Sequence, residues 1–222
     1  MKILAILLTL SLFVSCGRSN SASNNGAIRI ISSSFFDTFS IKKNSSQQGW
    51  DSSVSASLYE NMKVPALVSL FEIQIDNDDL KSLKCSNFNS LSTEEKSLFY
   101  IVFISSIAKL ESGFDPSNMT YDPTHRNWNV GLLQIDKHSA IRHAPEIADS
   151  SITDEDLKGE ELNLHVGLYI LKNQLNGKFR PEIKGKLLPN SSYYWEVLNS
   201  SFRSRFLKAY YNNYDLLTFC QE

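Results

Sequence analysis

The sequence predicts a mainly α-helical protein, and three observations support this prediction. The apolar run Leu98–Ile104 covers every face of a helix and follows a helix-start signal. A second stretch, 154–175, places apolar residues at helical spacing. No segment after residue 85 shows convincing alternation of apolar and polar residues, the pattern of a half-buried strand. We therefore expect a helical main domain over residues 85–222, preceded by an N-terminal extension over residues 27–84.

The first residues are typical of an export signal. Lys2 is the only charge, and the apolar run Ile3–Val14 is too short to span a bilayer as a helix. The sequence around Cys16 resembles the lipobox of bacterial lipoproteins, in which the cysteine is lipidated and becomes the mature N-terminus. We predict a signal peptide over 1–15 and a lipid-anchored, flexible tether over 16–26, rich in Ser, Asn and Gly. An ordinary signal peptide with an incidental cysteine is the alternative.

The chain has three cysteines, and an odd count in an exported protein requires an explanation. If Cys16 carries lipid, Cys85 and Cys220 remain as a pair that would connect the start of the main domain to its last residues. Two separate buried thiols are the alternative, although an oxidising compartment favours pairing. The cysteine and histidine spacing indicates no metal site. We expect neither a metal nor a cofactor.

Composition excludes some classes of partner. The formal net charge of −2 is too small to indicate nucleic-acid binding or strong attraction to an anionic surface. No segment after the signal could span a membrane, so a lipid on Cys16 would be the attachment, holding the protein on a membrane without crossing it. We expect a monomer in the cell envelope, on the periplasmic face. The sequence Gly17-Arg18 lacks an obvious inner-membrane retention Asp, which favours the outer membrane by resemblance to bacterial sorting rules.

The extension offers structure but no chemistry. Ile28–Ile31 has the composition of a strand, and Leu58–Phe71 has helical spacing with an expected break at Pro65. We expect these residues to pack on the main domain.

The central helix of the main domain ends in a candidate acid. Ser92 and Glu95 fit a capping box at its start. One face then carries Glu111 at its end, in line with Ile101, Ile104 and Ala108. Gly113 and Pro116 would terminate the helix. Apolar surroundings raise the pKa of a carboxyl group, so Glu111 could hold a proton near neutral pH and act as a general acid.

Two further helices are expected. One covers about 154–175, with Asp154, Glu155 and Asp156 at its positive end. The other covers about 193–217 and is rich in aromatic residues.

Four motifs, in order, resemble those of soluble lytic transglycosylases and goose-type lysozymes. They are Glu111-Ser112-x-Phe114-x-Pro116, Gly131-Leu132-Leu133-Gln134-Ile135, Asn163-Leu164-x-x-Gly167-x-x-Ile170-Leu171, and Ala209-Tyr210-Tyr211-Asn212. Ile170 stands at a position where the family has Tyr, with Tyr169 just before it. Asn213-Tyr214 replaces the closing Ala-Gly of the fourth motif. The resemblance extends over about 91–215 and implies a lysozyme-like fold, so the full expectation is a lysozyme-like transglycosylase domain with an N-terminal extension.

The resemblance also implies the substrate and the reaction. The substrate would be peptidoglycan glycan strands, cleaved at the β-1,4 bond between N-acetylmuramic acid and N-acetylglucosamine. A single glutamate, Glu111, would act first as acid and then as base, with help from the N-acetyl group of the substrate. The 6-hydroxyl of the muramic sugar would close onto the anomeric carbon and leave a 1,6-anhydro end. The sequence offers only one carboxylate that looks well placed for this chemistry.

Further roles follow by position from the resemblance. Ser112 would contact the substrate or orient Glu111, with a helix-end cap as the alternative. Leu133 and Gln134 would bind the sugar amide, with a turn packed on the core as the alternative.

Tyr211 would hydrogen-bond Glu111 and tune its pKa, and Tyr210 could do so instead. We expect Asn163 to support the site structurally, and we include it with Tyr169 and Asn212 among the substrate-binding residues.

Residues between the first two motifs leave alternatives open. Tyr121 and Trp128 could stack on sugar rings, although single exposed aromatics are common. Asp122 and Asp136 are candidates for a water-activating base in a hydrolase of the same bond, although we favour loop and turn roles for both. A non-catalytic glycan-binding envelope lipoprotein and a secreted effector acting on a competitor's wall are the remaining alternatives.

Overall fold

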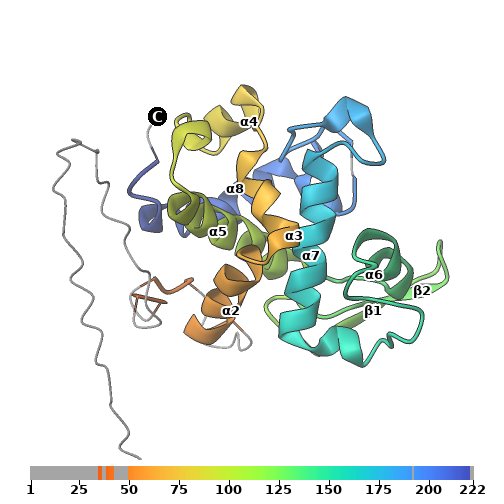
Figure 1. The fold of residues 1–222 in the computed structure, drawn as a ribbon. Coiled ribbons are helices and arrows are strands. Elements are labelled where there is room, and N and C mark those ends of the chain that lie inside the picture. Colours follow the sequence, from red (N-terminus) through yellow and green to blue (C-terminus); the bar gives the residue numbers. More distant parts are fainter. Residues whose placement is uncertain (1–34, 37–38, 43–49, 192, 221–222) are drawn as a thin grey trace, which may run out of the picture. The chain divides into compact units, whose positions relative to one another are not determined.

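The computed structural model describes residues 35–36, 39–42, 50–191 and 193–220, all within one unit, Ile31–Glu222. The predicted signal peptide, the tether with Cys16 and the strand-like Ile28–Ile31 lie outside the described residues. Most of the described chain is helical (Figure 1). The helices are α2 (Ser52–Met62), α3 (Pro65–Val68), α4 (Asn77–Ser82), α5 (Thr93–Glu111), α6 (Lys137–His143), α7 (Glu160–Leu175) and α8 (Arg203–Tyr211).

Helix α5 is the centre of the core. It begins at the predicted capping box, in which Ser92 and Glu95 each accept the other's backbone N–H. Every residue from Lys96 to Ala108 is buried, as expected for a helix that is apolar on all sides. Helices α2 and α8 pack against it, and α7 packs against α2 (Figure 1). Glu111 is therefore the last residue of a helix that is buried along most of its length.

The described part of the extension shares this core. Trp50, Leu58 and Met62 are almost completely buried, and α2 contacts both α5 and α7. The expected break at Pro65 is confirmed, because α2 ends at Met62 and α3 begins with Pro65. Proline suits that first helical position because its missing N–H would have no partner there.

Residues after α8 are joined to two earlier segments by covalent and polar contacts. Cys85 and Cys220 form the expected disulfide, across 135 positions of sequence. Lys42 Nζ lies 2.7 Å from a carboxylate oxygen of Asp215, and the Lys42 N–H donates to Asn213 Oδ1 at 2.7 Å. These contacts hold the segment before α2 against the residues after α8.

Three expectations about elements need correction. The chain forms a small antiparallel hairpin of β1 (Met119–Asp122) and β2 (Asn127–Val130), where no strand was expected. The helix expected over 154–175 begins later, at Glu160, after a 3₁₀ turn at Asp156–Lys158. The helix expected over 193–217 is instead a short 3₁₀ turn, η5 (Glu196–Leu198), then α8 and a last 3₁₀ turn at Tyr214–Leu216.

Within the residues that the structure describes, no helix is both long and apolar enough to cross a bilayer.

Candidate active site

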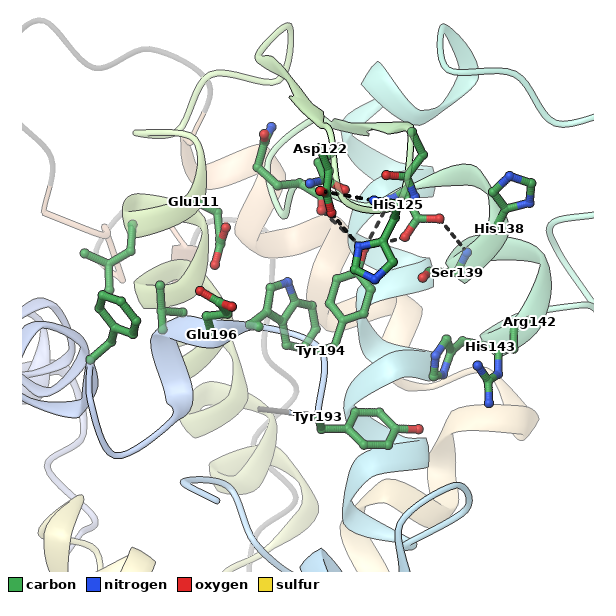
Figure 2. Close-up of a pocket in the computed structure, with 18 of the residues that line it drawn as sticks. Glu111, Asp122, His125, His138, Ser139, Arg142, His143, Tyr193, Tyr194 and Glu196 are labelled. Carbon is green, nitrogen blue, oxygen red and sulfur yellow. Dashed lines mark hydrogen bonds and ion pairs between the residues drawn. The ribbon is translucent and has the colours of Figure 1, made fainter. Parts of the chain in front are cut away.

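A pocket of about 810 Å³ opens at the C-terminal end of α5. The hairpin, the turn before α6, α6 itself, the segment before and within η5, and the start of α8 complete its walls (Figure 2). The side chains that line it are mostly polar. They include Glu111, Asp122, His125, Asn127, Asn129, Gln134, Asp136, His138, Ser139, Arg142, His143, Tyr193, Tyr194, Glu196 and Arg205.

Glu111 lines this pocket with an altered acidity. Burial, together with the charge of Glu196, raises its pKa from 4.5 to about 7. The carboxyl group also lies at the negative end of the α5 dipole, which disfavours its ionised form. Figure 2 shows the side chains of Glu111 and Glu196 pointing toward one another across one side of the pocket. A glutamate in this environment is protonated to a large extent near neutral pH and can act as a general acid.

Ser112 fixes the end of α5 rather than lining the pocket. Its Oγ lies 3.0 Å from the carbonyl of Ala108, one turn back, and 2.9 Å from the carbonyl of Leu132. The hydroxyl therefore bonds the helix end to the turn of the second motif. Of the two expected roles, the structure shows the helix-end cap.

The turn of the second motif is built on Asn163 of α7. Gly131 has φ +78°, and a Cβ there would lie 2.5 Å from Asn163 Nδ2, so glycine is required. Asn163 Nδ2 donates to the carbonyls of Val130 and Leu157, each at 2.9 Å, and its Oδ1 accepts the Leu133 N–H at 2.9 Å. Asn163 is thus a structural support, as expected, and the substrate-binding role given to it is not what its contacts show.

Leu133 is buried, and both of its backbone groups have internal partners. Its N–H donates to Asn163, and its carbonyl accepts the indole N–H of Trp195 at 2.9 Å. Its side chain packs where a Cβ on Gly167 would lie, only 2.2 Å from Leu133 Cδ1. These contacts show the alternative, a turn packed on the core, and the expected contact from Leu133 to a sugar stays a prediction.

Gln134 is the residue of this motif that lines the pocket. Its backbone adopts φ +49°, and its Nε2 donates to the carbonyls of Asn118 and Gly131 at 3.1 and 3.0 Å. These bonds fix the direction of the side-chain amide.

The two aspartates considered as the base of a hydrolase, Asp122 and Asp136, each stabilise a turn and also line the pocket. Asp122 accepts the N–H groups of Thr124 and His125 at 2.7 and 3.3 Å, and its Oδ2 lies 2.6 Å from His125 Nδ1. Asp136 is the N-cap of α6 and accepts the Ser139 N–H at 2.9 Å. Both have the expected loop and turn roles, yet both also line the pocket.

Glu111 therefore shares the pocket with other carboxylates, and the expectation that only one is well placed for the chemistry stays a prediction. Asp122, Asp136 and Glu196 all line the pocket with Glu111. The hydrogen bond from His125 is the largest influence that lowers the pKa of Asp122, so this group is ionised at neutral pH.

The expected tyrosine partner of Glu111 lies elsewhere. The Tyr211 hydroxyl donates to the carbonyl of Ser82 at the surface, and the Tyr210 ring packs against Phe99. Phe99 precedes Glu111 along α5 by about 18 Å at 1.5 Å per residue. The end of α8 that carries Tyr210 and Tyr211 therefore lies far from Glu111, and it is the start of α8 that reaches the pocket. Neither tyrosine lines the pocket.

Two more expected substrate contacts are also outside the pocket lining. Asn212 is the exposed C-cap of α8. Tyr169 is buried on α7, with its ring centre 5.6 Å from that of His165.

The hairpin separates its aromatic residues from its pocket-lining ones. Tyr121 pairs with Trp128 across the two strands, their ring centres 5.2 Å apart and both side chains exposed. Successive residues of a strand point to opposite faces, so these rings lie on the other face from Asp122 and Asn127, which line the pocket.

Sequence reasoning missed the wall that follows α7. Tyr193, Tyr194 and Glu196 come from a segment that was expected to be the start of a helix and to carry no site residue. Arg142 and Arg205 come from two different helices. The Tyr194 hydroxyl accepts the Asp136 N–H at 3.1 Å and lies 3.3 Å from the Gln134 carbonyl, which fixes this segment to the second motif. The run Tyr193-Tyr194-Trp195 is the sequence signal that could have drawn attention to it.

Among residues 35–220, as far as the structure describes them, no group of three or more His, Cys, Asp or Glu side chains could hold a metal ion.

Comparison with known proteins agrees with this geometry. Residues 91–185 match the transglycosylase SLT domain, from the start of α5 to beyond α7. The match ends before the pocket-lining residues Tyr193, Tyr194 and Glu196, and before the fourth motif. No curated protein matches the chain.

Three solved structures share the fold. "Bd0314 DslA wild-type form 2" is 21% identical, with a TM-score of 0.60, over 77% of this chain and 92% of that one. Two structures of glutamate-to-glutamine mutants of the same protein have TM-scores of 0.58 and 0.59, at the same identity and coverage. At this level of identity, the likeness establishes a common fold.

Proposed function

Since this chain carries a transglycosylase SLT domain at residues 91–185, we propose that it is a peptidoglycan lytic transglycosylase with Glu111 as its catalytic acid and base. One observation carries the proposal. Glu111 lies at the wall of an open pocket, and its pKa is raised to about 7 by burial and by Glu196. A carboxyl group that is neutral in part at physiological pH can give a proton to a glycosidic oxygen and afterwards take one back.

The reaction balances with this one residue. The protonated Glu111 would donate its proton to the oxygen of the bond between N-acetylmuramic acid and N-acetylglucosamine, and the bond would break with help from the substrate's N-acetyl group. The resulting carboxylate would then take the proton of the muramic 6-hydroxyl as that oxygen bonds to the anomeric carbon. Glu111 returns to its protonated form, and no water is consumed.

A hydrolase of the same bond is the second candidate, and the position of Asp122 favours it. This carboxylate lines the pocket with Glu111 and is kept ionised by the hydrogen bond from His125. Many glycosidases pair a protonated carboxyl with an ionised one, and the ionised one can activate water.

The product decides between the two reactions. Purified sacculi would be digested by the mature protein in H₂¹⁸O and the fragments analysed by mass spectrometry. We expect fragments that end in 1,6-anhydromuramic acid, lighter by one water than hydrolytic ones, and without ¹⁸O. Reducing ends that carry ¹⁸O would assign the protein as a hydrolase and point to Asp122.

We also propose that a lipid on Cys16 holds the protein at the periplasmic face of the outer membrane. The lipobox-like sequence supports this proposal. Cells fed a radiolabelled fatty acid should label the wild-type protein, and Cys16→Ser should abolish the label. A Cys16→Ser protein that still carries the label would refute the assignment.

A further inference from the structure

A second group of polar side chains lies across the pocket from Glu111. Arg142, His143 and Tyr193 line the pocket on the side opposite Glu111 and Glu196 (Figure 2). None of the three takes part in the reaction proposed above. Their contacts show what they could bind.

The Tyr193 hydroxyl is a buried donor without a partner. Within the described residues it makes no hydrogen bond, although its oxygen is inaccessible to solvent. Burial raises the pKa of Tyr193 to about 12, so the phenol keeps its proton. A buried polar group without a partner is costly. Because Tyr193 lines the pocket, a ligand that displaces the atoms covering this hydroxyl would complete its hydrogen bonding.

His143 contributes an N–H. Asn173 Nδ2 donates to the His143 carbonyl at 3.0 Å, which fixes the orientation of the Asn173 amide. The same nitrogen lies 3.3 Å from His143 Nδ1, so Nδ1 is the acceptor and Nε2 carries the proton. Burial, with the charge of Arg142, lowers the pKa of His143 to about 4. His143 is therefore a neutral donor through Nε2 at neutral pH.

Arg142 supplies the positive charge on a fixed aromatic platform. Its guanidinium lies 4.3 Å from the centre of the Phe179 ring. Phe179 also stacks on Tyr193, with centres 6.4 Å apart, and its ring lies at 85° to that of His143, with centres 5.1 Å apart. The three donors are thus held around one ring, and little side-chain freedom would be lost on binding.

We propose that Arg142, His143 and Tyr193 bind a carboxylate carried on the lactyl arm of a muramic sugar. The inference rests on the proposed function for the identity of the ligand. A carboxylate has two acceptor oxygens, which suit a forked guanidinium with further N–H and O–H donors beside it. Glu111, which holds a proton, and the charge of Glu196 lie on the other side of the pocket (Figure 2). The charge of Glu196 repels an anion, so the charges orient the ligand.

Two groups in peptidoglycan could present a carboxylate to this site. In glycan without peptides, the lactyl group itself ends in a carboxylate. In intact strands, the lactyl group is joined to a stem peptide that has carboxylates of its own. The site would distinguish both from chitin oligomers, which have no lactyl arm.

Binding measured in a Glu111→Gln background, in which the proposed acid is absent, would test the inference. The ligands would be a peptide-free muramyl oligosaccharide, the same oligosaccharide with its stem peptides, the peptide form with its carboxylates converted to amides, and a chitin oligomer of equal length. Arg142→Ala is the test variant, and Tyr193→Phe is a second one that keeps the ring. Lys178→Ala is the matched control, because the Lys178 ammonium lies 5.3 Å from the Phe179 ring but Lys178 does not line the pocket.

We expect Arg142→Ala to weaken binding of a carboxylate ligand about tenfold to a hundredfold, as for a charged hydrogen bond. Binding of the amidated peptide and the chitin oligomer should not change. Lys178→Ala removes a charge that also acts on His143 but lies outside the pocket lining, so it should weaken carboxylate binding far less than Arg142→Ala does. If only the peptide-free oligosaccharide binds more weakly to Arg142→Ala, the site binds the lactyl carboxylate. If only the form with stem peptides does, the site binds a carboxylate of the peptide. Equal losses for all four ligands, or no loss for any, would overturn the inference.

The outcomes separate this inference from the proposed function. If the wild-type protein cleaves sacculi but Arg142→Ala shows no ligand-selective loss, only the carboxylate site is refuted. If binding is selective but no cleavage product forms, the site stands and the catalytic proposal fails.

Discussion

Replacing Glu111 with glutamine should stabilise the fold, but only at neutral and alkaline pH. The wild-type pKa rises from 4.5 in the unfolded chain to about 7 in the fold. Each unit of pKa difference corresponds to about 1.4 kcal/mol, so ionising Glu111 in the fold costs about 3 kcal/mol. Glutamine has nearly the same shape and no charge, so the variant avoids this cost.

The sign follows from the order of the two pKa values. Below about pH 4.5 the carboxyl is protonated in both the folded and the unfolded chain, and its contribution to stability is fully present. As the pH rises from 4.5 to 7, the unfolded chain loses the proton first, and the wild-type fold loses stability relative to the variant. Above about pH 7 the loss is complete.

Denaturant unfolding of the two proteins at pH 4 and pH 8.5 measures this difference. The stability of Glu111→Gln relative to the wild type should rise by about 3 kcal/mol between the two pH values. Glu146→Gln, at an exposed position outside the pocket lining, is the control and should show no comparable rise. A stability difference between Glu111→Gln and the wild type that is the same at both pH values would refute the buried, proton-holding environment.

Three other predictions concern the support of the site. Glu196→Gln removes a charge that raises the pKa of Glu111, so the alkaline limb of the pH–activity profile should move to lower pH; an unmoved limb would exclude this influence. Asn163→Ala should destabilise the fold by about 2–4 kcal/mol in thermal or denaturant unfolding, because it leaves buried backbone groups without partners; a loss below 0.5 kcal/mol would contradict the role of Asn163. Replacing Cys85 and Cys220 by serine should lower the free energy of unfolding by up to about 5 kcal/mol, since the disulfide closes a loop of 135 positions. An unchanged denaturation midpoint would show that the disulfide does not stabilise the fold.

Local sequence signals were sufficient to predict the parts of the site that lie on α5. Ser92 and Glu95 predicted the start of the helix, and Gly113, with φ +65°, follows its end as expected. The position of Glu111 at the end of a helix that is apolar on all sides predicted a raised pKa. These features depend on neighbours in sequence, so the chain itself reveals them.

Other features depend on contacts that the sequence does not display. The strands Met119–Asp122 and Asn127–Val130 are only four residues long and mostly polar, so they lack the alternation that indicates a strand. Glu196 reaches Glu111 only because the fold returns the chain to the end of α5. Tyr211 was misplaced because its assignment needed the direction in which α8 runs along α5, which is set by packing.

The roles of the second motif were predicted only in part, because they depend on contacts between residues that are distant in sequence. Gly131 and Asn163 belong to different motifs, and their direct packing explains why both residue types are needed. The sequence could not show that these contacts use both backbone groups of Leu133 and leave only Gln134 on the pocket.

The release of muropeptides from purified sacculi by the wild type and by Glu111→Gln tests the central claim most directly. The account predicts that the wild type releases fragments and that the variant, although folded and at least as stable at pH 8, loses activity by a factor of about a hundred or more, as for the loss of a general acid. A folded Glu111→Gln protein with wild-type activity would contradict the assignment of Glu111 as the acid and move the chemistry to another carboxylate of the pocket.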